Sequence, residues 1–227
     1  MTDGACIVIC VRYPEGGTVK SRLAAACGAG FVGELYGHFV ADSLDTLEGT
    51  GIPFIIAFDP PGKEEEMKRR FGKTHVYMPQ EGTDLGERMY GAFHRTFARG
   101  YTSVILIGSD IPDLPGEFLA EARSSLDGHD AVMGPARDGG YYLIGFRRDT
   151  LTPRVFDDIP WGTATVFADT AARFTKEGYD VHLLPEWYDT DRADDLRDLV
   201  ARNSDTPFAR SRTMAYLRGT TWDGGAS

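Results

Sequence analysis

Strand-like and helix-like patterns alternate along almost the whole chain, and this alternation limits the possible folds more than any other feature. Short apolar runs typical of buried strands lie at 6–11, 53–58, 75–78, 103–107, 131–133, 141–146 and 181–184. Segments with apolar residues at helical spacing or with helix-terminus signals lie at 31–47, 63–71, 84–99, 115–126, 164–177 and 194–202. This order predicts an α/β fold: a single-domain, Rossmann-like three-layer α/β/α sandwich with a mainly parallel mixed sheet.

The length of 227 residues suits one large α/β domain, and no repeat or linker divides the chain. We expect the domain to cover 1–218 and the glycine-rich end, 219–227, to be a disordered tail. The net charge of −10 opposes sequence-independent binding to nucleic acid. Because no apolar stretch approaches the roughly 20 residues of a transmembrane helix, we expect a cytoplasmic protein without an integral membrane segment.

Asp110 follows directly after the apolar run 103–107, with Gly108 before it and Pro112 behind it. In open α/β sheets, the carboxyl ends of the strands form the edge where ligands bind. Mg²⁺ takes oxygen ligands, usually one or two carboxylates plus the phosphates of a substrate. Asp110 is therefore a candidate metal ligand. An Asp that only caps the following turn or helix is the alternative.

The loop after the first predicted strand gathers positive charge in an acidic protein. It contains Arg12, Lys20 and Arg22, and a helix is predicted to begin near Lys20. Gly17 and its neighbour allow backbone N–H groups to turn toward an anion, and a helix N-terminus also favours negative charge. These features predict a pyrophosphate site. The alternative is a flexible, solvated loop without a ligand.

A second polar loop follows the predicted strand 75–78 and reaches the same edge of the sheet. Gln80 and Gly82 are candidates for contacts with a base or ribose, and Arg88 for a contact with a phosphate. Asp84 is a further nucleotide-binding candidate, although it also has the position of a helix N-cap.

A third polar segment lies between the predicted strands 131–133 and 141–146. Its Asp-Gly-Gly sequence is by itself a strong turn signal. We also consider Arg137, Gly139 and Gly140 candidates for binding a sugar or acceptor and Asp138 a candidate catalytic residue. Trp161 either stacks on a sugar ring or packs in the protein.

A fourth segment carries Asp189 and Asp191 shortly after the last predicted strand. Two carboxylates at this position could supply the second part of a metal site with Asp110. Asp191 could equally be the N-cap of the following helix.

Together, these segments resemble the bacterial glycosyltransferase-like proteins of an uncharacterised domain family within the GT-A nucleotide-diphospho-sugar transferase superfamily. The resemblance runs from about residue 6 to residue 196. It rests on Arg-x-Pro-x-x-Gly-x-x-Lys-Ser-Arg-Leu at 12–23, Gln-x-Gly-x-Asp-Leu-Gly-x-Arg-Met at 80–89, Gly-Ser-Asp-Ile-Pro at 108–112, Asp-Gly-Gly-Tyr-Tyr-Leu-Ile-Gly at 138–145 and Asp-x-Asp-x-x-x-Asp-Leu at 189–196.

The resemblance implies a nucleotide-diphospho-sugar transferase fold in which the first loop wraps a nucleoside and its phosphates. It implies that Asp110 and Asp191 bind Mg²⁺ or Mn²⁺, with Asp189 in reserve for the second position. Relatives often read Asp-Thr-Pro-Glu-Asp-Leu where residues 191–196 read Asp-Arg-Ala-Asp-Asp-Leu, so the turn-setting proline is absent here. The single Asp110 is closer to the nucleotidyltransferase branch, such as molybdenum-cofactor and phospholactate guanylyltransferases.

The expected activity is metal-dependent transfer of a sugar from a nucleotide-sugar to a small-molecule acceptor, with Asp110 and Asp138 as the catalytic carboxylates. The alternative is nucleotidyl transfer from a nucleoside triphosphate to a phosphorylated small molecule. A non-catalytic nucleotide-sugar-binding module is the alternative from another class. The sequence leaves the base, the sugar, the acceptor and the oligomeric state open.

Overall fold

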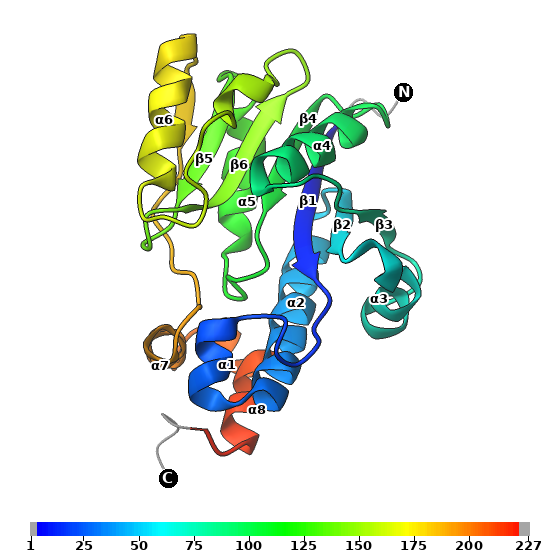
Figure 1. Ribbon diagram of the computed structural model, residues 1–227, viewed down its shortest axis with the longest axis vertical. Coiled ribbons are helices and arrows are strands. Elements are labelled where there is room, and N and C mark those ends of the chain that lie inside the picture. The colour runs from blue at the N-terminus through cyan, green and yellow to red at the C-terminus, as the bar shows by residue number, and fades with distance from the viewer. Residues whose placement is uncertain (1–3, 223–227) are drawn as a thin grey trace.

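The computed structural model describes residues 4–222, which form a seven-stranded sheet with helices on both faces (Figure 1). The strands are β1 Ala5–Arg12, β2 Phe54–Asp59, β3 Val76–Pro79, β4 Ser103–Ile107, β5 Ala131–Pro135, β6 Tyr141–Arg147 and β7 Val181–Leu183. The helices are α1 Ser21–Cys27, α2 Ala29–Thr50, α3 Glu64–Phe71, α4 Leu85–Phe97, α5 Gly116–Ser125, α6 Val166–Glu177, α7 Ala193–Arg202 and α8 Arg212–Gly219. Short 3-10 turns, η1 to η3, lie at Pro61–Lys63, Pro153–Val155 and Pro207–Arg210.

The strands are ordered β3-β2-β1-β4-β6-β5-β7, and all are parallel except β6. The central strand β1 pairs in parallel with β2 on one side and with β4 on the other. The carboxyl ends of these three strands therefore meet at one edge, where Arg12, Asp59 and Gly108 lie. The strand β6 is antiparallel to β4 and β5, which confirms the predicted mixed, mainly parallel sheet.

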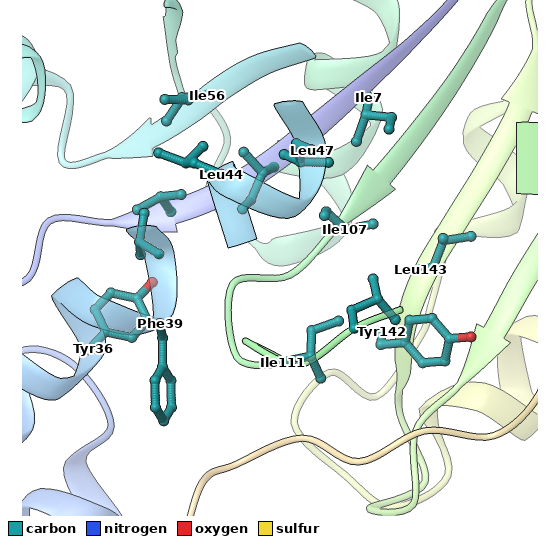
Figure 2. Close-up of a cluster of buried hydrophobic side chains, with 14 of the residues drawn as sticks. Ile7, Tyr36, Phe39, Leu44, Leu47, Ile56, Ile107, Ile111, Tyr142 and Leu143 are labelled. Atoms are coloured by element: carbon teal, nitrogen blue, oxygen red, sulfur yellow. The ribbon is translucent and has the colours of Figure 1, made fainter. Parts of the chain in front are cut away.

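Alternate side chains of β1 enter two separate cores. Ile7 and Ile9 face the helices α2, α5 and α7, and they pack in one cluster with buried residues such as Phe39 of α2. Figure 2 shows this cluster, where side chains of α2 meet those of β1, β2 and β4. Full burial of a side chain such as Phe39 contributes roughly 2–3 kcal/mol. The long amphipathic helix α2 thus fixes one outer layer against the sheet.

The opposite face of the sheet is covered by α4 and α6. Cys6 and Val8 of β1 join a second cluster that contains Phe93 of α4 and Phe174 of α6. The ring of Phe93 meets that of Phe146 of β6 edge to face, with centroids 5.1 Å apart. The predicted three-layer α/β/α sandwich is confirmed.

The helix α8 was not expected from the sequence. Asp42 of α2 holds its start: the carboxylate accepts hydrogen bonds from the backbone N–H groups of Arg212 (3.0 Å) and Thr213 (2.8 Å). The ordered fold also extends past the expected boundary at residue 218, because Trp222 is buried in the α2 core and stacks on Phe31. Residues 223–227 of the expected tail lie outside the described residues. None of the helices in the described part of the chain is long and apolar enough to cross a membrane.

Candidate functional site

A cavity of about 1150 Å³ opens at the carboxyl edge of the parallel strands. Its walls come from the segments that follow β1, β2, β3 and β4, from the β5–β6 turn and from residues 188–202. All four polar segments identified in the sequence therefore meet here. The sequence-predicted residues that line the cavity are Arg12, Lys20, Arg22, Gln80, Arg88, Asp110, Arg137, Asp138, Gly140, Trp161, Asp189 and Asp191.

The ammonium group of Lys20 lies between two carboxylates in this cavity. Its Nζ atom is 2.7 Å from Oδ1 of Asp110 and 2.5 Å from Oδ1 of Asp191. The Lys20 side chain is 4% exposed, whereas those of Asp110 and Asp191 are 47% and 37% exposed. Burial alone would lower the pKa of Lys20, but the two carboxylates outweigh it and raise the pKa above its ordinary value. Lys20 therefore carries a fixed positive charge at neutral pH.

The backbone of Lys20 adopts an unusual conformation that accompanies this placement. Lys20 is the N-cap of α1 and has φ 49° and ψ 52°, in the left-handed region. This conformation costs an L-residue about 1–2 kcal/mol relative to the right-handed one. The loop before it is held by the Arg12 guanidinium, which donates a hydrogen bond to the carbonyl of Thr18 (3.2 Å). The two ion pairs of the Lys20 side chain offset the backbone strain.

The carboxylate of Asp191 faces Lys20 because another residue caps the helix α7. The Asp195 carboxylate accepts the backbone N–H groups of Asp191 (3.0 Å) and Arg192 (2.7 Å), and Arg192 occupies the N-cap position. The backbone N–H of Thr190 donates to the carbonyl of Asp110 (3.1 Å), which ties this segment to the end of β4. The alternative role of Asp191 as a helix cap is therefore excluded.

Tyr36 and Ser109 form a buried hydrogen-bond chain beneath Asp110, and neither was identified from the sequence. The backbone N–H of Arg12 donates to the Tyr36 hydroxyl (3.1 Å), which lies 2.6 Å from Ser109 Oγ. Ser109 Oγ donates to the carbonyl of Cys10 (2.8 Å), so the Tyr36 hydroxyl donates to Ser109. Burial and the negative charge of Asp110 raise the pKa of Tyr36 to about 12. The Tyr36 hydroxyl therefore keeps its proton at neutral pH and can donate a hydrogen bond to Ser109. The chain locks α2, β1 and the end of β4 together.

Two arginines share one carboxylate at the β1–β2 side of the cavity. Arg12 Nε is 3.2 Å from Asp59 Oδ2, and Arg88 Nη1 is 3.7 Å from the same oxygen. The side-chain amide of Gln80 donates a hydrogen bond to the backbone carbonyl of Ala57 (2.8 Å). Asp59 was not identified from the sequence, although it ends a strand at the same edge as Asp110. The pair of guanidinium groups leaves this side of the cavity with a net positive charge.

The β5–β6 turn is both a tight turn and a wall of the cavity. The Asp138 carboxylate accepts the backbone N–H of Gly140 (2.8 Å), as in an Asx-type turn. Gly139 has φ +90°, and a Cβ atom there would overlap the backbone carbonyl of Ala164. The turn therefore requires glycine and presents Arg137 and Asp138 to the cavity.

The ring of Tyr188, which lines the cavity, is in contact with two guanidinium groups. The guanidinium carbons of Arg137 and Arg202 are 4.5 Å and 4.7 Å from the ring centroid. Arg202 binds the buried Asp113 carboxylate through two nitrogens (2.8 and 3.0 Å), and Arg137 pairs with Glu186 (3.2 Å). The sequence offered no signal for Tyr188 or Arg202, since the contact joins residues from three distant segments. The stack fixes the segment that carries Asp189 and Asp191.

Asp189 lies in a negatively charged part of the cavity. Burial raises the pKa of Asp189 to about 6, and the nearby carboxylates of Asp138 and Asp191 add to the shift. The positive charge of Lys20 opposes it. Asp189 therefore titrates just below neutral pH.

Trp161 packs against the start of α4 and also lines the cavity. A Cβ atom on Gly86 would lie only 3.0 Å from Cζ2 of Trp161, so the indole ring rests directly on this glycine. The packing role considered from the sequence is therefore present, and the remaining surface of the ring faces the cavity.

Four sequence-predicted residues do not line the cavity: Gly17, Gly82, Asp84 and Gly139. Asp84 caps α4, because its Oδ1 atom accepts the backbone N–H of Glu87 (2.8 Å). Capping, rather than contact with a nucleotide, therefore explains Asp84. Gly82 lies tightly against the first turn of α4, where a Cβ atom would be 2.7 Å from the backbone nitrogen of Arg88. The three glycines belong to the backbone of the loops that shape the cavity.

Comparison with known protein families shows which family this chain belongs to. Residues 44–163, more than half of the sequence, match the family described as uncharacterized protein conserved in bacteria (DUF2064). The chain belongs to the DUF2064 family. The matched region contains Asp110, Asp138 and Arg137, whereas Lys20 and Asp191 lie outside it. The resemblance expected from the sequence motifs is confirmed. No curated protein matches the sequence of this chain.

A solved structure is similar to this DUF2064 protein over nearly its full length. It is the crystal structure of a protein from Desulfovibrio desulfuricans G20 described as a candidate nucleotide-diphospho-sugar transferase. The two share 42% sequence identity with a TM-score of 0.92, and the match covers 96% of this chain and 95% of the other. The chain therefore has the nucleotide-diphospho-sugar transferase fold that was predicted.

More distant structures share the fold alone. One is 4-diphosphocytidyl-2C-methyl-D-erythritol synthase from Anaerococcus prevotii DSM 20548, at 12% identity and a TM-score of 0.59, covering 89% of this chain and 99% of that one. Another is Rv0371c from Mycobacterium tuberculosis H37Rv, crystallised with manganese, at 15% identity and a TM-score of 0.52, covering 88% and 100%.

The donor set around Lys20 fits a divalent cation in this DUF2064 protein. Asp110 and Asp191 each place an oxygen within 2.7 Å of one nitrogen, so their carboxylates converge on a point that already holds a positive charge. Within residues 4–222, no three His, Cys, Asp or Glu side chains cluster as a metal site. Mg²⁺ needs only one or two protein carboxylates when a substrate phosphate completes its coordination.

Proposed function

We propose that this protein is a Mg²⁺- or Mn²⁺-dependent transferase that takes a nucleotide-activated sugar as donor and a small molecule as acceptor. The observation that carries the proposal is the Lys20 ammonium held between Asp110 and Asp191 in a large cavity at the carboxyl edge of the sheet. The fold shared with the Desulfovibrio protein supports a nucleotide-sugar substrate.

Asp110 and Asp191 would hold the metal, which supplies Lewis-acid stabilisation of the diphosphate when bound. Lys20 contributes a second positive charge, and its ammonium exchanges one carboxylate partner for a phosphate oxygen when the donor binds. Arg12 and Arg88 lie on the β1–β2 side, where their shared carboxylate leaves a net positive charge for the nucleotide. Stabilisation of the charge that develops on the leaving diphosphate is the main catalytic contribution.

Asp138 and the turn that carries it form the acceptor side. In glycosyl transfer, the acceptor hydroxyl gives its proton to the Asp138 carboxylate as its oxygen bonds to the sugar carbon. The bond from that carbon to the diphosphate breaks, and the nucleoside diphosphate leaves with the electron pair. Arg137 and Trp161 line the same side of the cavity and position the acceptor or sugar.

Nucleotidyl transfer is the second candidate, and one observation favours it. A single carboxylate, Asp110, follows β4, with the buried Ser109 before it, so this edge lacks the paired Asp-x-Asp of many sugar transferases. In this reaction, a phosphate oxygen of the acceptor attacks the α-phosphorus of a nucleoside triphosphate and pyrophosphate leaves. A module that only binds nucleotide-sugars would show binding without either product.

The test combines ligand binding with product analysis. Purified protein is screened by thermal shift against nucleoside triphosphates and UDP-, GDP-, ADP- and CDP-sugars, each with Mn²⁺, Mg²⁺ or EDTA. A ligand at about 100 times its Kd stabilises the fold by roughly 2.7 kcal/mol, which is readily seen. We expect a metal-dependent shift with one nucleotide-sugar, and release of the nucleoside diphosphate when an acceptor is supplied.

Asp110→Asn should abolish the metal-dependent shift and the turnover, and Asp157→Asn provides the matched control, since Asp157 is exposed and outside the cavity. Wild-type turnover by Asp110→Asn would overturn the metal site. A shift and turnover with a nucleoside triphosphate alone would replace glycosyl transfer by nucleotidyl transfer.

A further inference from the structure

Two arginines in the cavity wall are not used by the ion pairs described above. Seven basic side chains line the cavity, and five of them are paired with carboxylates: Arg12, Lys20, Arg88, Arg137 and Arg202. The other two are Arg22 and Arg192, and neither forms an ion pair with any residue in the described part of the chain. Both side chains are exposed.

The two arginines flank the Lys20–Asp191 ion pair. Arg22 is two residues after Lys20 and belongs to α1, and Arg192 directly follows Asp191 at the start of α7. The 2.5 Å contact between Lys20 and Asp191 holds these two backbone segments together, and α1 and α7 are in contact. Arg22 and Arg192 therefore belong to the two segments that this ion pair joins, and both line the cavity.

Nearby carboxylates do not neutralise Arg192. The Asp195 carboxylate is engaged by the backbone N–H groups at the start of α7, and Asp198, which also lines the cavity, forms no ion pair with either arginine among the described residues. Among the basic side chains that line the cavity, these two guanidinium groups are the ones that no carboxylate of the described residues neutralises. Guanidinium groups bind phosphate oxygens through paired, charge-assisted hydrogen bonds.

We propose that Arg22 and Arg192 form a second anion subsite, which binds a phosphate group other than those held at Asp110, Asp191 and Lys20. The subsite rests on the proposed function, because it extends the same cavity. Its phosphate is either the third phosphate of a nucleoside triphosphate or the phosphate of the acceptor. Both sources imply a substrate set with more phosphate groups than a nucleotide-sugar alone carries.

The test uses inorganic phosphate compounds, so the identity of the nucleotide base need not be known. Isothermal titration measures the Kd of pyrophosphate and of tripolyphosphate, both with Mg²⁺, for the wild type, Arg22→Ala and Arg192→Ala. A loss of about tenfold in tripolyphosphate affinity for both variants, with a change of less than about twofold for pyrophosphate, would support the subsite and favour nucleotidyl transfer over glycosyl transfer. This result assigns the subsite to a third phosphate of the nucleotide.

A second titration measures the Kd of inorganic phosphate for protein already saturated with pyrophosphate and Mg²⁺. We expect an approximately tenfold loss here in both variants, which assigns the subsite to the phosphate of the acceptor and agrees with the proposed nucleotide-sugar donor. Arg192→Lys keeps the charge and should retain part of the affinity in whichever titration responds. Arg210→Ala, which removes an exposed arginine of η3 outside the cavity, should change neither.

The subsite would be overturned if Arg22→Ala and Arg192→Ala bound both ligands as tightly as Arg210→Ala does. The proposed function would still stand in that case, provided that pyrophosphate binding required Mg²⁺ and Asp110. Pyrophosphate binding that ignores Mg²⁺ and survives Asp110→Asn would overturn the proposed metal site. A selective loss in the arginine variants would support the subsite even then.

Discussion

The Nζ atom of Lys20 and the Oδ1 atom of Asp191 are 2.5 Å apart, although 171 positions separate the two residues in the sequence. The ion pair closes the cavity between the first loop and the last acidic segment of the chain. The same ammonium group is 2.7 Å from Asp110 at the end of β4. One buried cation thus holds together the loop after β1, the end of β4 and the segment before α7.

Removal of this ammonium should make the fold depend on a divalent cation. Lys20→Met leaves Asp110 and Asp191 facing each other without a counter-charge. We expect the free energy of unfolding in EDTA to fall by about 2 kcal/mol. The loss is smaller than for a fully buried ion pair because both carboxylates are partly exposed. Mg²⁺ should restore more stability to the variant than it adds to the wild type. Urea unfolding with Mg²⁺ or EDTA measures both effects. Lys63→Met, at a surface pair with Glu15, is the control, and an equal effect of Mg²⁺ on all three proteins would contradict the prediction.

The raised pKa of Asp189 should make stability fall as the pH rises toward neutral. The folded pKa is about 6, above the ordinary value of 3.8, so the native state binds more protons than the unfolded state between these values. The stabilisation is complete below pH 3.8 and is lost as the pH passes 6. Asp189→Asn removes the titration, so the variant should gain stability relative to the wild type between pH 4.5 and pH 7.5. Urea unfolding in EDTA at several pH values tests this, and a constant difference across the range would contradict it.

Tyr36→Phe should weaken nucleotide binding as well as the fold. The substitution leaves the backbone N–H of Arg12 without its acceptor and Ser109 without its donor, at a cost of about 1–2 kcal/mol. The affected atoms lie at the ends of β1 and β4, from which Arg12 and Asp110 extend. Tyr77→Phe, which removes a comparable hydrogen bond to the carbonyl of Gly72 (2.7 Å) away from the cavity, should cost similar stability without a change in affinity. Chemical unfolding and nucleotide titration separate the two effects, and equal affinities of the two variants would show that the hydrogen-bond chain does not position the site.

Gly139→Ala should be far more harmful than Gly162→Ala, although both glycines have positive φ. A methyl group at Gly139 would overlap the backbone carbonyl of Ala164, whereas one at Gly162 meets no atom within 4 Å. We expect a loss of about 3 kcal/mol or more for Gly139→Ala, from backbone strain and overlap together, and about 1 kcal/mol for Gly162→Ala. Thermal unfolding compares them. Similar midpoints would mean that the turn adapts and does not hold Asp138 rigidly.

The sequence predicted the sheet and the segments that line the cavity because both follow from local patterns. Apolar runs such as 103–107 mark buried strands, and a polar residue directly after such a run, as at Asp110, must lie at the carboxyl edge. The position of Arg192 as N-cap of α7 could not be read in the same way. Both Asp191 and Asp195 can accept backbone N–H groups, and only the folded backbone determines which one does.

Contacts between distant segments were not accessible from the sequence. The stack of Arg137, Tyr188 and Arg202 depends on the pairing of the β5–β6 turn with the segment after β7, which no local pattern encodes. The chain from Tyr36 to Ser109 depends on the rotation of α2 over β1. Helix α8 was missed because its start is fixed by Asp42, a residue in another helix.

The single antiparallel strand has an evolutionary consequence for this protein family. Because β6 runs against its neighbours, β5 and β6 are joined by a short hairpin at the cavity edge, and the chain needs no crossover helix there. Insertions and replacements in such a hairpin leave the register of the surrounding strands unchanged. The loops after β1, β2 and β4 belong to the parallel side of the sheet and lie outside this hairpin. Under the proposed function, acceptor preference can therefore change through the hairpin tip without a change in the strands that carry the proposed nucleotide site.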